Sequence, residues 1–368
     1  MKTTHLSAVA VVALLFTPVT SCLDVASERV RLDEQIGVAA IDGGGRIDVR
    51  DGLASVRSVT PGEVVLWGQA PAFEVELMVP TGAPSTWTLT VRNALPDAQL
   101  TGDGVTITAR AEALPTVRSF DIALTPGTTT HLRMAPPDVD QPGRYRFGVL
   151  SDVQEAIDRV GDIHRKINET PDVRFVLGIG DLTQRGKREE LERFQKELEA
   201  LHVPYFATLG NHELGDEDPP VYYELVGRGN SHFVYRGVHY SLVDSASATL
   251  DPEVYDWLDG WLAEGRDAVH IFGMHVPPLD PVGSRNGAFG SRAEAAKLLS
   301  RLGEGRVDLT LYGHIHTYFP YSNAGIPAYI SGGGGAIPER LDGIGRHFLV
   351  IDVNPASGVE QVGVVRVD

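Results

Sequence analysis

The chain of 368 residues is long enough for two domains, and its formal net charge of −17 repels polyanions. Hydrophobic residues make up 42% of the chain and charged residues 22%, which argues against intrinsic disorder and against a coiled coil. Non-specific nucleic-acid binding rests on basic patches that release counterions, and the sequence has no such patch, so nucleic acid is not an expected partner.

The first 21 residues are expected to be an export signal. Lys2 precedes an apolar run over residues 6–19, and small residues lead to Cys22, the single cysteine. The run is shorter than the roughly 20 apolar residues that cross a membrane. The segment that ends at Cys22 resembles the lipobox of bacterial lipoproteins, which implies a lipid on Cys22 and a membrane-anchored protein on the periplasmic or cell-surface side. A plain secretory signal, with a soluble exported protein, is the alternative. Residues 22–36 are then expected to form a polar tether.

Residues 37–136 have the pattern of a small all-β domain. Apolar and polar side chains alternate over residues 87–92, 105–108 and 120–124. This period of two predicts strands with one buried face, and Gly- and Pro-rich turns separate them. We expect a β-sandwich with no function visible beyond that of a scaffold, followed by a linker over residues 137–145.

From residue 146 to residue 368, strand-like runs alternate with helix-like segments. Two sets of apolar residues recur at helical spacing: Ile157, Val160, Ile163 and Ile167, and then Leu191, Phe194, Leu198 and Leu201. Alternation of strands and helices predicts an α/β domain.

Five apolar runs in this region each lead into metal-binding types of side chain. These side chains are Asp152 and Gln154 after residues 147–150, Asp181 after residues 175–179, Asn211, His212 and Glu213 after residues 205–209, His275 after residues 269–272, and His314 and His316 after residues 309–312. Open α/β sheets gather ligands beyond the carboxyl ends of their strands, so these ends are expected to converge. Carboxylates and neutral imidazoles bind Mn, Fe and Zn ions, and the sequence therefore predicts a metal site.

The series resembles the calcineurin-like metallophosphoesterase superfamily, whose pattern runs Asp-x-His, Gly-Asp, Gly-Asn-His-Asp/Glu, His and Gly-His-x-His. The resemblance covers residues 147–352 and implies a four-layer α/β (α+β) core, with two mixed sheets flanked by helices. It also implies two divalent or trivalent metal ions, with Mn, Fe or Zn expected. The implied activity is hydrolysis of a small phosphomonoester or phosphodiester by a metal-bound hydroxide.

The resemblance also assigns a role to each motif residue. Asp181 would bridge the metals, Asp152 and His316 would hold the first, and Asn211, His275 and His314 would hold the second. His212 would face the substrate and stabilise charge or protonate the leaving oxygen. Glu213 would orient His212.

Gln154 departs from the family pattern, which has histidine at this position. An amide oxygen can bind a hard cation, but it binds a transition metal more weakly than imidazole does. Three roles stay open for Gln154: a ligand of the first metal, an outer hydrogen-bond donor, or neither. The identity and occupancy of the first metal stay open with it.

Two other functions fit parts of the sequence. A surface-anchored binding protein with a degenerate metal site would account for Gln154, and metal analysis combined with turnover would separate it from an enzyme. A nuclease is a further alternative because the superfamily contains nucleases, but the acidic charge and the lack of basic or stacking tracts count against it. No residue pattern specifies the substrate or an oligomeric state.

Overall fold

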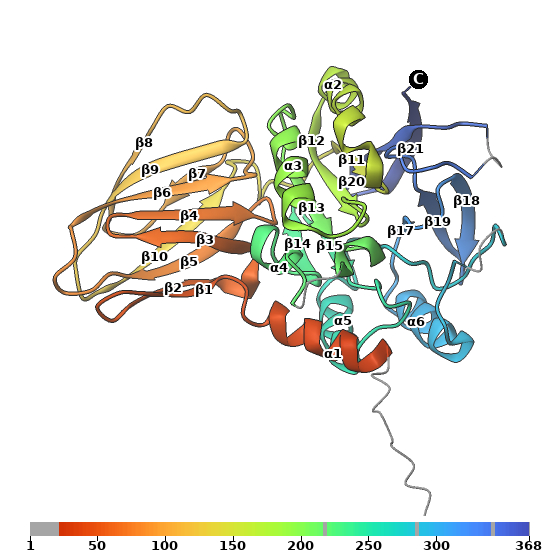
Figure 1. The fold of residues 1–368 in the computed structure, drawn as a ribbon, viewed down its shortest axis with the longest axis horizontal. Coiled ribbons are helices and arrows are strands. Elements are labelled where there is room, and N and C mark those ends of the chain that lie inside the picture. Colours follow the sequence, from red (N-terminus) through yellow and green to blue (C-terminus); the bar gives the residue numbers. More distant parts are fainter. Residues whose placement is uncertain (1–21, 216–218, 284–286, 340–342, 368) are drawn as a thin grey trace, which may run out of the picture.

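The computed structural model describes residues 22–215, 219–283, 287–339 and 343–367 (Figure 1). The expected export signal of residues 1–21 lies outside the described residues. The strands fall into an N-terminal β region, residues 38–135, and a C-terminal region, residues 145–367. Among the helices of the described residues, none has the length and apolar character needed to cross a bilayer.

The N-terminal β region holds two five-stranded sheets, ordered β1-β2-β5-β10-β7 and β3-β4-β6-β9-β8. Their strands are β1 (Val38–Ile41), β2 (Gly45–Val49), β3 (Ala54–Thr60), β4 (Glu63–Gly68), β5 (Phe73–Met78), β6 (Thr86–Arg92), β7 (Gln99–Thr101), β8 (Thr106–Ala109), β9 (Val117–Ala123) and β10 (Thr129–Ala135). The three strands expected from alternation correspond to β6, β8 and β9. In β6, Trp87, Leu89 and Val91 are buried while their neighbours are not, as the period of two requires.

The C-terminal region holds two mixed sheets, as predicted. The first sheet has the order β13 (Tyr205–Thr208), β12 (Val173–Ile179), β11 (Tyr145–Leu150), β20 (His347–Asn354) and β21 (Gly358–Arg366). The second has the order β14 (Ser231–Tyr235), β15 (Val238–Val243), β16 (Val269–Met274), β17 (Leu309–Tyr312), β19 (Ile326–Ser331) and β18 (Tyr318–Asn323). β11, β12 and β13 are parallel, and so are β15, β16, β17 and β19. Their carboxyl ends therefore lie together at one edge of each sheet.

Helices cover the outer faces of both sheets and complete a four-layer core (Figure 1). The first sheet packs against the 3-10 helix η2 (Gln154–Arg159), α2 (Gly161–Glu169), α3 (Arg188–Leu198) and α4 (Tyr222–Leu225), and the second against α5 (Pro252–Glu264) and α6 (Arg292–Glu304). The first apolar set expected on one helix spans η2 and α2, which meet at Val160. Aromatic residues fill the space between the sheets; Phe175 of the first sheet contacts Tyr240 of the second with ring centroids 5.5 Å apart.

The expected polar tether is wrong over most of its length, because residues Cys22–Asp33 form helix α1. Ala26 and Val30 are buried, and Val30 joins the apolar cluster between the second sheet and its helices. Arg29 and Asp33 are also buried, at 1% and 0% exposure. The polar pattern predicts exposed side chains, but Arg29 and Asp33 face the protein and bind buried partners there. Figure 1 shows α1 lying along the C-terminal region beside α5.

The expected linker of residues 137–145 is packed against the C-terminal region, and its last residue begins β11. Val139 is buried, and its carbonyl accepts a hydrogen bond from the Arg236 amide at 2.8 Å. The side-chain amide of Asn93, in the N-terminal β region, donates to the Tyr205 carbonyl and accepts from the Tyr205 amide, at 2.8 Å each. Tyr205 lies in the edge strand β13, so Asn93 protects that edge from pairing elsewhere.

Candidate metal centre

Each motif residue lies just beyond the carboxyl end of a strand, as predicted. Asp152 and Gln154 follow β11, Asp181 follows β12, Asn211, His212 and Glu213 form the 3-10 helix η3 (Asn211–Leu214) after β13, His275 follows β16, and His314 and His316 follow β17. Asp152, Asp181 and His314 have φ angles of 61°, 52° and 68°. Left-handed backbone of this kind costs a non-glycine residue about 1–3 kcal/mol and clusters at functional sites. Gly180 permits the turn before Asp181, because a Cβ there would lie 2.7 Å from the Gly210 nitrogen.

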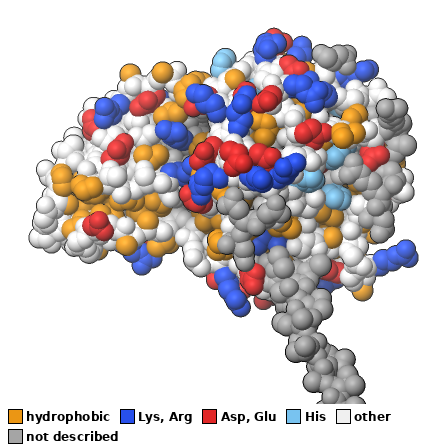
Figure 2. All heavy atoms as spheres, viewed as in Figure 1, with side chains coloured by type: hydrophobic (Ala, Val, Ile, Leu, Met, Phe, Trp, Pro, Cys, Tyr) orange, Lys and Arg blue, Asp and Glu red, His pale blue; other side chains and the backbone are white. Residues whose placement is uncertain are grey.

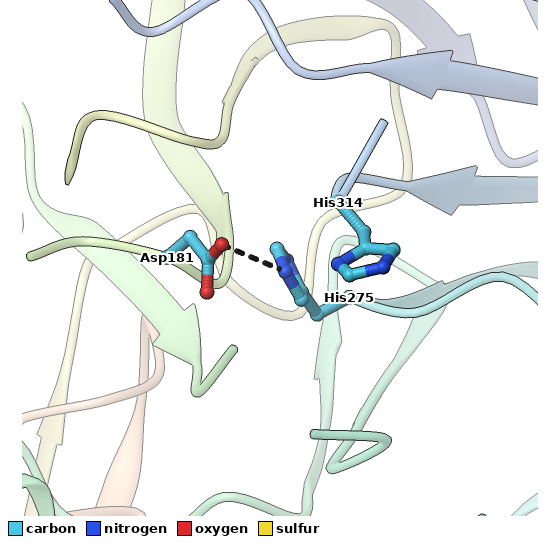
Figure 3. A group of neighbouring side chains, drawn as sticks. All are labelled: Asp181, His275 and His314. Atoms are coloured by element: carbon cyan, nitrogen blue, oxygen red, sulfur yellow. Dashed lines mark ion pairs between the residues drawn. The ribbon is translucent and has the colours of Figure 1, made fainter. Parts of the chain in front are cut away.

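Asp181, Asn211, His275 and His314 form what we name the second metal group. Figure 3 shows Asp181, His275 and His314, whose ligand-type atoms all lie within 4.8 Å of one another. The Nε2 atom of His275 lies 3.1 Å from an Asp181 oxygen and 3.2 Å from the Asn211 amide oxygen. The His314 Nδ1 atom lies 2.8 Å from the same Asn211 oxygen. Oxygen and imidazole nitrogen atoms thus face a common centre, as the ligands of a transition metal do.

The electrostatics of this group favour a positive charge at its centre. Burial alone would lower the pKa of His275, but the Asp181 carboxylate raises it to about 9. His275 Nδ1 donates to the Ile179 carbonyl at 2.8 Å, which turns Nε2 toward Asp181 and Asn211. A backbone acceptor on the far nitrogen is the usual way in which proteins orient a metal-binding histidine.

Asp152, Gln154, Asp181 and His316 form what we name the first metal group. Ligand-type atoms of Asp152, Asp181 and His316 lie within 4.8 Å of one another, and all three residues are buried. His316 Nδ1 donates to the Ile337 carbonyl at 2.7 Å, so Nε2 faces Asp152 at 3.4 Å. The Gln154 amide nitrogen donates to Asp181 at 2.7 Å and lies 3.2 Å from His316 Nε2. Gln154 therefore touches two members of the group with a hydrogen-bond donor.

Asp181 belongs to both groups. Its Oδ2 atom contacts His275 and Gln154, which lie in different groups, while its Oδ1 atom accepts from the His212 backbone amide at 2.9 Å. Burial alone would raise the pKa of Asp181, but the His275 and His212 imidazoles hold it well below its usual range. A carboxylate that stays ionised between two ligand sets is suited to bridge two cations.

His212 and Glu213 are adjacent in η3, but they do not interact in the expected way. His212 is partly exposed and its Nδ1 atom donates to the Gln184 carbonyl at 2.6 Å, so a backbone carbonyl orients the ring and Glu213 does not. Glu213 is buried and accepts from the Thr183 amide at 2.9 Å and the Gly210 amide at 2.8 Å. Burial and then the nearby Asp181 charge raise the pKa of Glu213 to about 7. Glu213 thus joins the loops that follow β12 and β13 and does not face the opening of the site.

Comparison with known proteins finds relatives for the part of the chain that carries this site. The profile of the calcineurin-like phosphoesterases matches residues 145–318. A curated relative, the 3',5'-cyclic-nucleotide phosphodiesterase alr5338 of Nostoc sp., is 28% identical over 162 residues, which cover 40% of this chain and 58% of the relative. The match thus spans less than two thirds of that protein.

A solved structure shares the fold over most of this chain. The purple acid phosphatase PPD1 from yellow lupin (Lupinus luteus) seeds superimposes with a TM-score of 0.51 at 15% sequence identity, covering 81% of this chain and 73% of that one. A dimetal phosphatase from Danio rerio gives a TM-score of 0.47 at 13% identity, over 61% of this chain and 99% of its own.

Several residues that support the candidate metal centre are not visible as motifs. The Ser151 hydroxyl donates to Asp152 at 2.6 Å, and the carbonyls of Gln184 and Ile337 hold His212 and His316. Backbone acceptors carry no sequence signature, so sequence alone could not find the last two. Ser151 has a signal in its position next to Asp152, at the end of a strand.

The candidate metal centre opens on one side. Asn211, His212 and His314 are partly exposed, whereas Asp152, Asp181 and His275 are buried. Figure 2 shows histidine side chains at the surface of the C-terminal region, and acidic and basic side chains interspersed among the described residues of that face. A ligand would approach from the side of the partly exposed residues Asn211, His212 and His314.

Proposed function

We propose that the protein hydrolyses phosphoester bonds with two metal ions, held by the first and second metal groups. The observation that carries the proposal is that Asp181 is shared between two ligand sets. The two sets have different imidazoles, His316 in the first and His275 and His314 in the second, so two ions fit the site better than one. The orientation of His275 and His316 by backbone carbonyls further supports metal binding, because it points Nε2 of each ring into its group.

Bound cations would supply Lewis acidity and lower the pKa of a coordinated water, as two-metal hydrolases require. The chain's own residues would orient the phosphoryl group and offset its charge. His212 is the residue suited to this, because its Nε2 atom lies 3.9 Å from Asp181 and its ring is partly exposed on the open side. With Nδ1 donating to Gln184, His212 could present Nε2 to a leaving oxygen and, when protonated, transfer a proton to it.

For the substrate, we propose a small phosphoester, with phosphodiesters favoured. The support is the Nostoc relative, which is a 3',5'-cyclic-nucleotide phosphodiesterase. The acidic net charge of −17 makes a long polyanion such as DNA a poor substrate.

For the whole chain, we propose export across a membrane on the signal of residues 1–21, with lipid attachment at Cys22 and the site outside the cytoplasm. The support is the sequence pattern that ends at Cys22. We propose residues 37–136 as a β-sandwich domain and residues 146–368 as the catalytic domain. Metabolic labelling with a radioactive fatty acid tests the anchor, and a Cys22→Ala variant should lose the label.

A substrate panel tests the activity most directly. Metal-depleted protein reconstituted with Mn, Fe, Zn or Mg would be assayed on bis-p-nitrophenyl phosphate, p-nitrophenyl phosphate, a 3',5'-cyclic nucleotide and a single-stranded oligonucleotide. We expect metal-dependent turnover of the small diesters and little of the oligonucleotide. Absence of turnover with every metal, together with incomplete metal occupancy, would support the binding protein with a degenerate metal site instead.

A further inference from the structure

Helix α1 presents two buried charged residues to loops of the C-terminal region. Asp33 is 0% exposed and Arg29 is 1% exposed, although both lie on a helix at the surface. Burying a charge is costly unless it is paired and hydrogen-bonded, so such residues commonly fix the groups they bind. Neither residue contributes to the metal groups described above.

Asp33 holds the loop that supports the strand leading to Asn211. One of its oxygens accepts from the Gly229 amide at 2.6 Å, and the other accepts from the Asn230 backbone amide at 3.1 Å and side-chain amide at 2.7 Å. The Gly229 carbonyl in turn accepts from the Thr208 hydroxyl at 2.8 Å. Thr208 is the last residue of β13 and lies three positions before Asn211.

Arg29 holds the loop that supports His275. Its guanidinium donates to both oxygens of Asp244, at 2.6 and 3.2 Å, and the pair is almost fully buried. The next residue, Ser245, accepts a hydrogen bond from the Val276 amide at 2.8 Å. Val276 directly follows His275, so this bond fixes the end of β16 where the ligand lies.

A further hydrogen bond joins the loop held by Asp33 to the loop held by Arg29. The Asn230 side-chain oxygen accepts it from the Asp244 amide at 2.9 Å. We infer that α1 positions the second metal group, with Asp33 and Arg29 acting as positioning residues through the loops that they hold. This inference rests on the proposed function for its meaning, but its test does not depend on turnover.

The test compares Asp33→Asn with Glu28→Gln. Asp33→Asn keeps the side-chain shape but replaces one acceptor oxygen with a donor that faces backbone amides. Glu28→Gln makes the same chemical change at an exposed position of α1. The readouts are Mn²⁺ binding by calorimetry and, on chelator-treated protein, hydrogen exchange in peptides covering residues 205–215 and 269–278.

We expect the tighter Mn²⁺ binding step to belong to the second metal group. For Asp33→Asn, its dissociation constant should rise at least about tenfold, which is the loss of affinity typical when a residue that supports metal ligands is changed. Exchange in both peptides should quicken at least about tenfold, because a buried hydrogen bond is lost. If the enzyme is active, excess Mn²⁺ should restore kcat. Glu28→Gln should match wild type in every readout.

A lower melting temperature with unchanged Mn²⁺ affinity and unchanged exchange in both peptides would show that α1 only stabilises the fold, and would overturn the inference. If Asp33→Asn does not fold, Arg29→Lys provides the test. It keeps the charge but loses the paired contact with Asp244, so we expect smaller changes in the same direction, and wild-type values would overturn the inference. Lack of turnover by wild type, with these binding results intact, would contradict the proposed function alone.

Discussion

The two metal groups share Asp181 but differ in what faces their centres. In the second group, the Asn211 oxygen and the His275 and His314 rings converge with Asp181. In the first group, the Gln154 amide nitrogen donates to Asp181. This N–H group interacts with the Asp181 carboxylate on the side where a cation of the first group would bind it. Rotation of the amide would present its oxygen as a ligand instead, but a weaker one than imidazole. From this difference we propose that the second group would bind a metal ion strongly and the first group weakly.

The largest effect is expected from Asp181→Asn, because it removes the carboxylate that both groups share. Substitution of a residue that only supports the ligands typically lowers metal affinity or activity by about 10- to 100-fold. Loss of the shared carboxylate should therefore lower kcat by more than about 100-fold. The measurement is turnover of bis-p-nitrophenyl phosphate with circular dichroism to confirm folding. Wild-type turnover in the folded variant would contradict the role of Asp181 in both groups.

A smaller loss is expected from His212→Ala. His212 lies outside both groups and its ring is held by the Gln184 carbonyl. We expect a fall of about 100-fold in kcat, typical of a lost general acid, with metal content unchanged. The check is turnover and metal analysis on the same sample. A change in metal content instead would make His212 a ligand.

Gln154→His should change the metal affinity of the first group and leave that of the second unchanged. An imidazole at this position should tighten binding of the ion in the first group, and we expect its dissociation constant to fall by about tenfold, the scale of a ligand-sphere change. Gln154→Ala should weaken the same step. The second group should keep its affinity in both variants, as calorimetry with Mn²⁺ would show. If both binding steps change equally, the two groups do not act as separate sites.

The smallest effect concerns pH and α1. Burial raises the pKa of Asp33 to about 7, against the lowering effect of Arg228. The other charged or titratable groups around it include Arg29, Asp244, Tyr222 and Tyr223. The folded state therefore holds this proton more tightly than the unfolded state does. Its contribution to stability is present below about pH 4 and is lost as the pH rises toward 7.

Relative to Asp33→Asn, the wild-type free energy of unfolding should fall across that window, by at most about 1.4 kcal/mol per pH unit. Urea denaturation of chelator-treated protein at several pH values measures this slope. Parallel curves for the two proteins would show that Asp33 does not titrate in this range.

Much of the site could be predicted from the sequence because each candidate ligand lies just after a strand. Asp181 follows β12 of the first sheet and His275 follows β16 of the second, and the carboxyl ends of the parallel strands in both sheets meet at this site. The hydrogen-bond partners of Glu213 could not be predicted. The motif identifies Glu213 as a site residue, but it does not identify the Thr183 amide that donates to it.

Helix α1 could not be predicted either. Its residues Arg29 and Asp33 look like surface charges in the sequence, and their burial depends on Asp244 and Gly229, about 200 positions away. Local patterns report which face of an element is apolar. They do not report a charged face that is buried through distant partners.

One metal titration tests the central claim, that a strong site and a weak site share Asp181. Metal-depleted wild type, Gln154→His and Asp181→Asn would be titrated with Mn²⁺ in the same buffer. We expect two binding steps in wild type, a tightening of only the weaker step in Gln154→His, and weakening of both in Asp181→Asn. A single step in wild type that Gln154→His leaves unchanged would contradict the account.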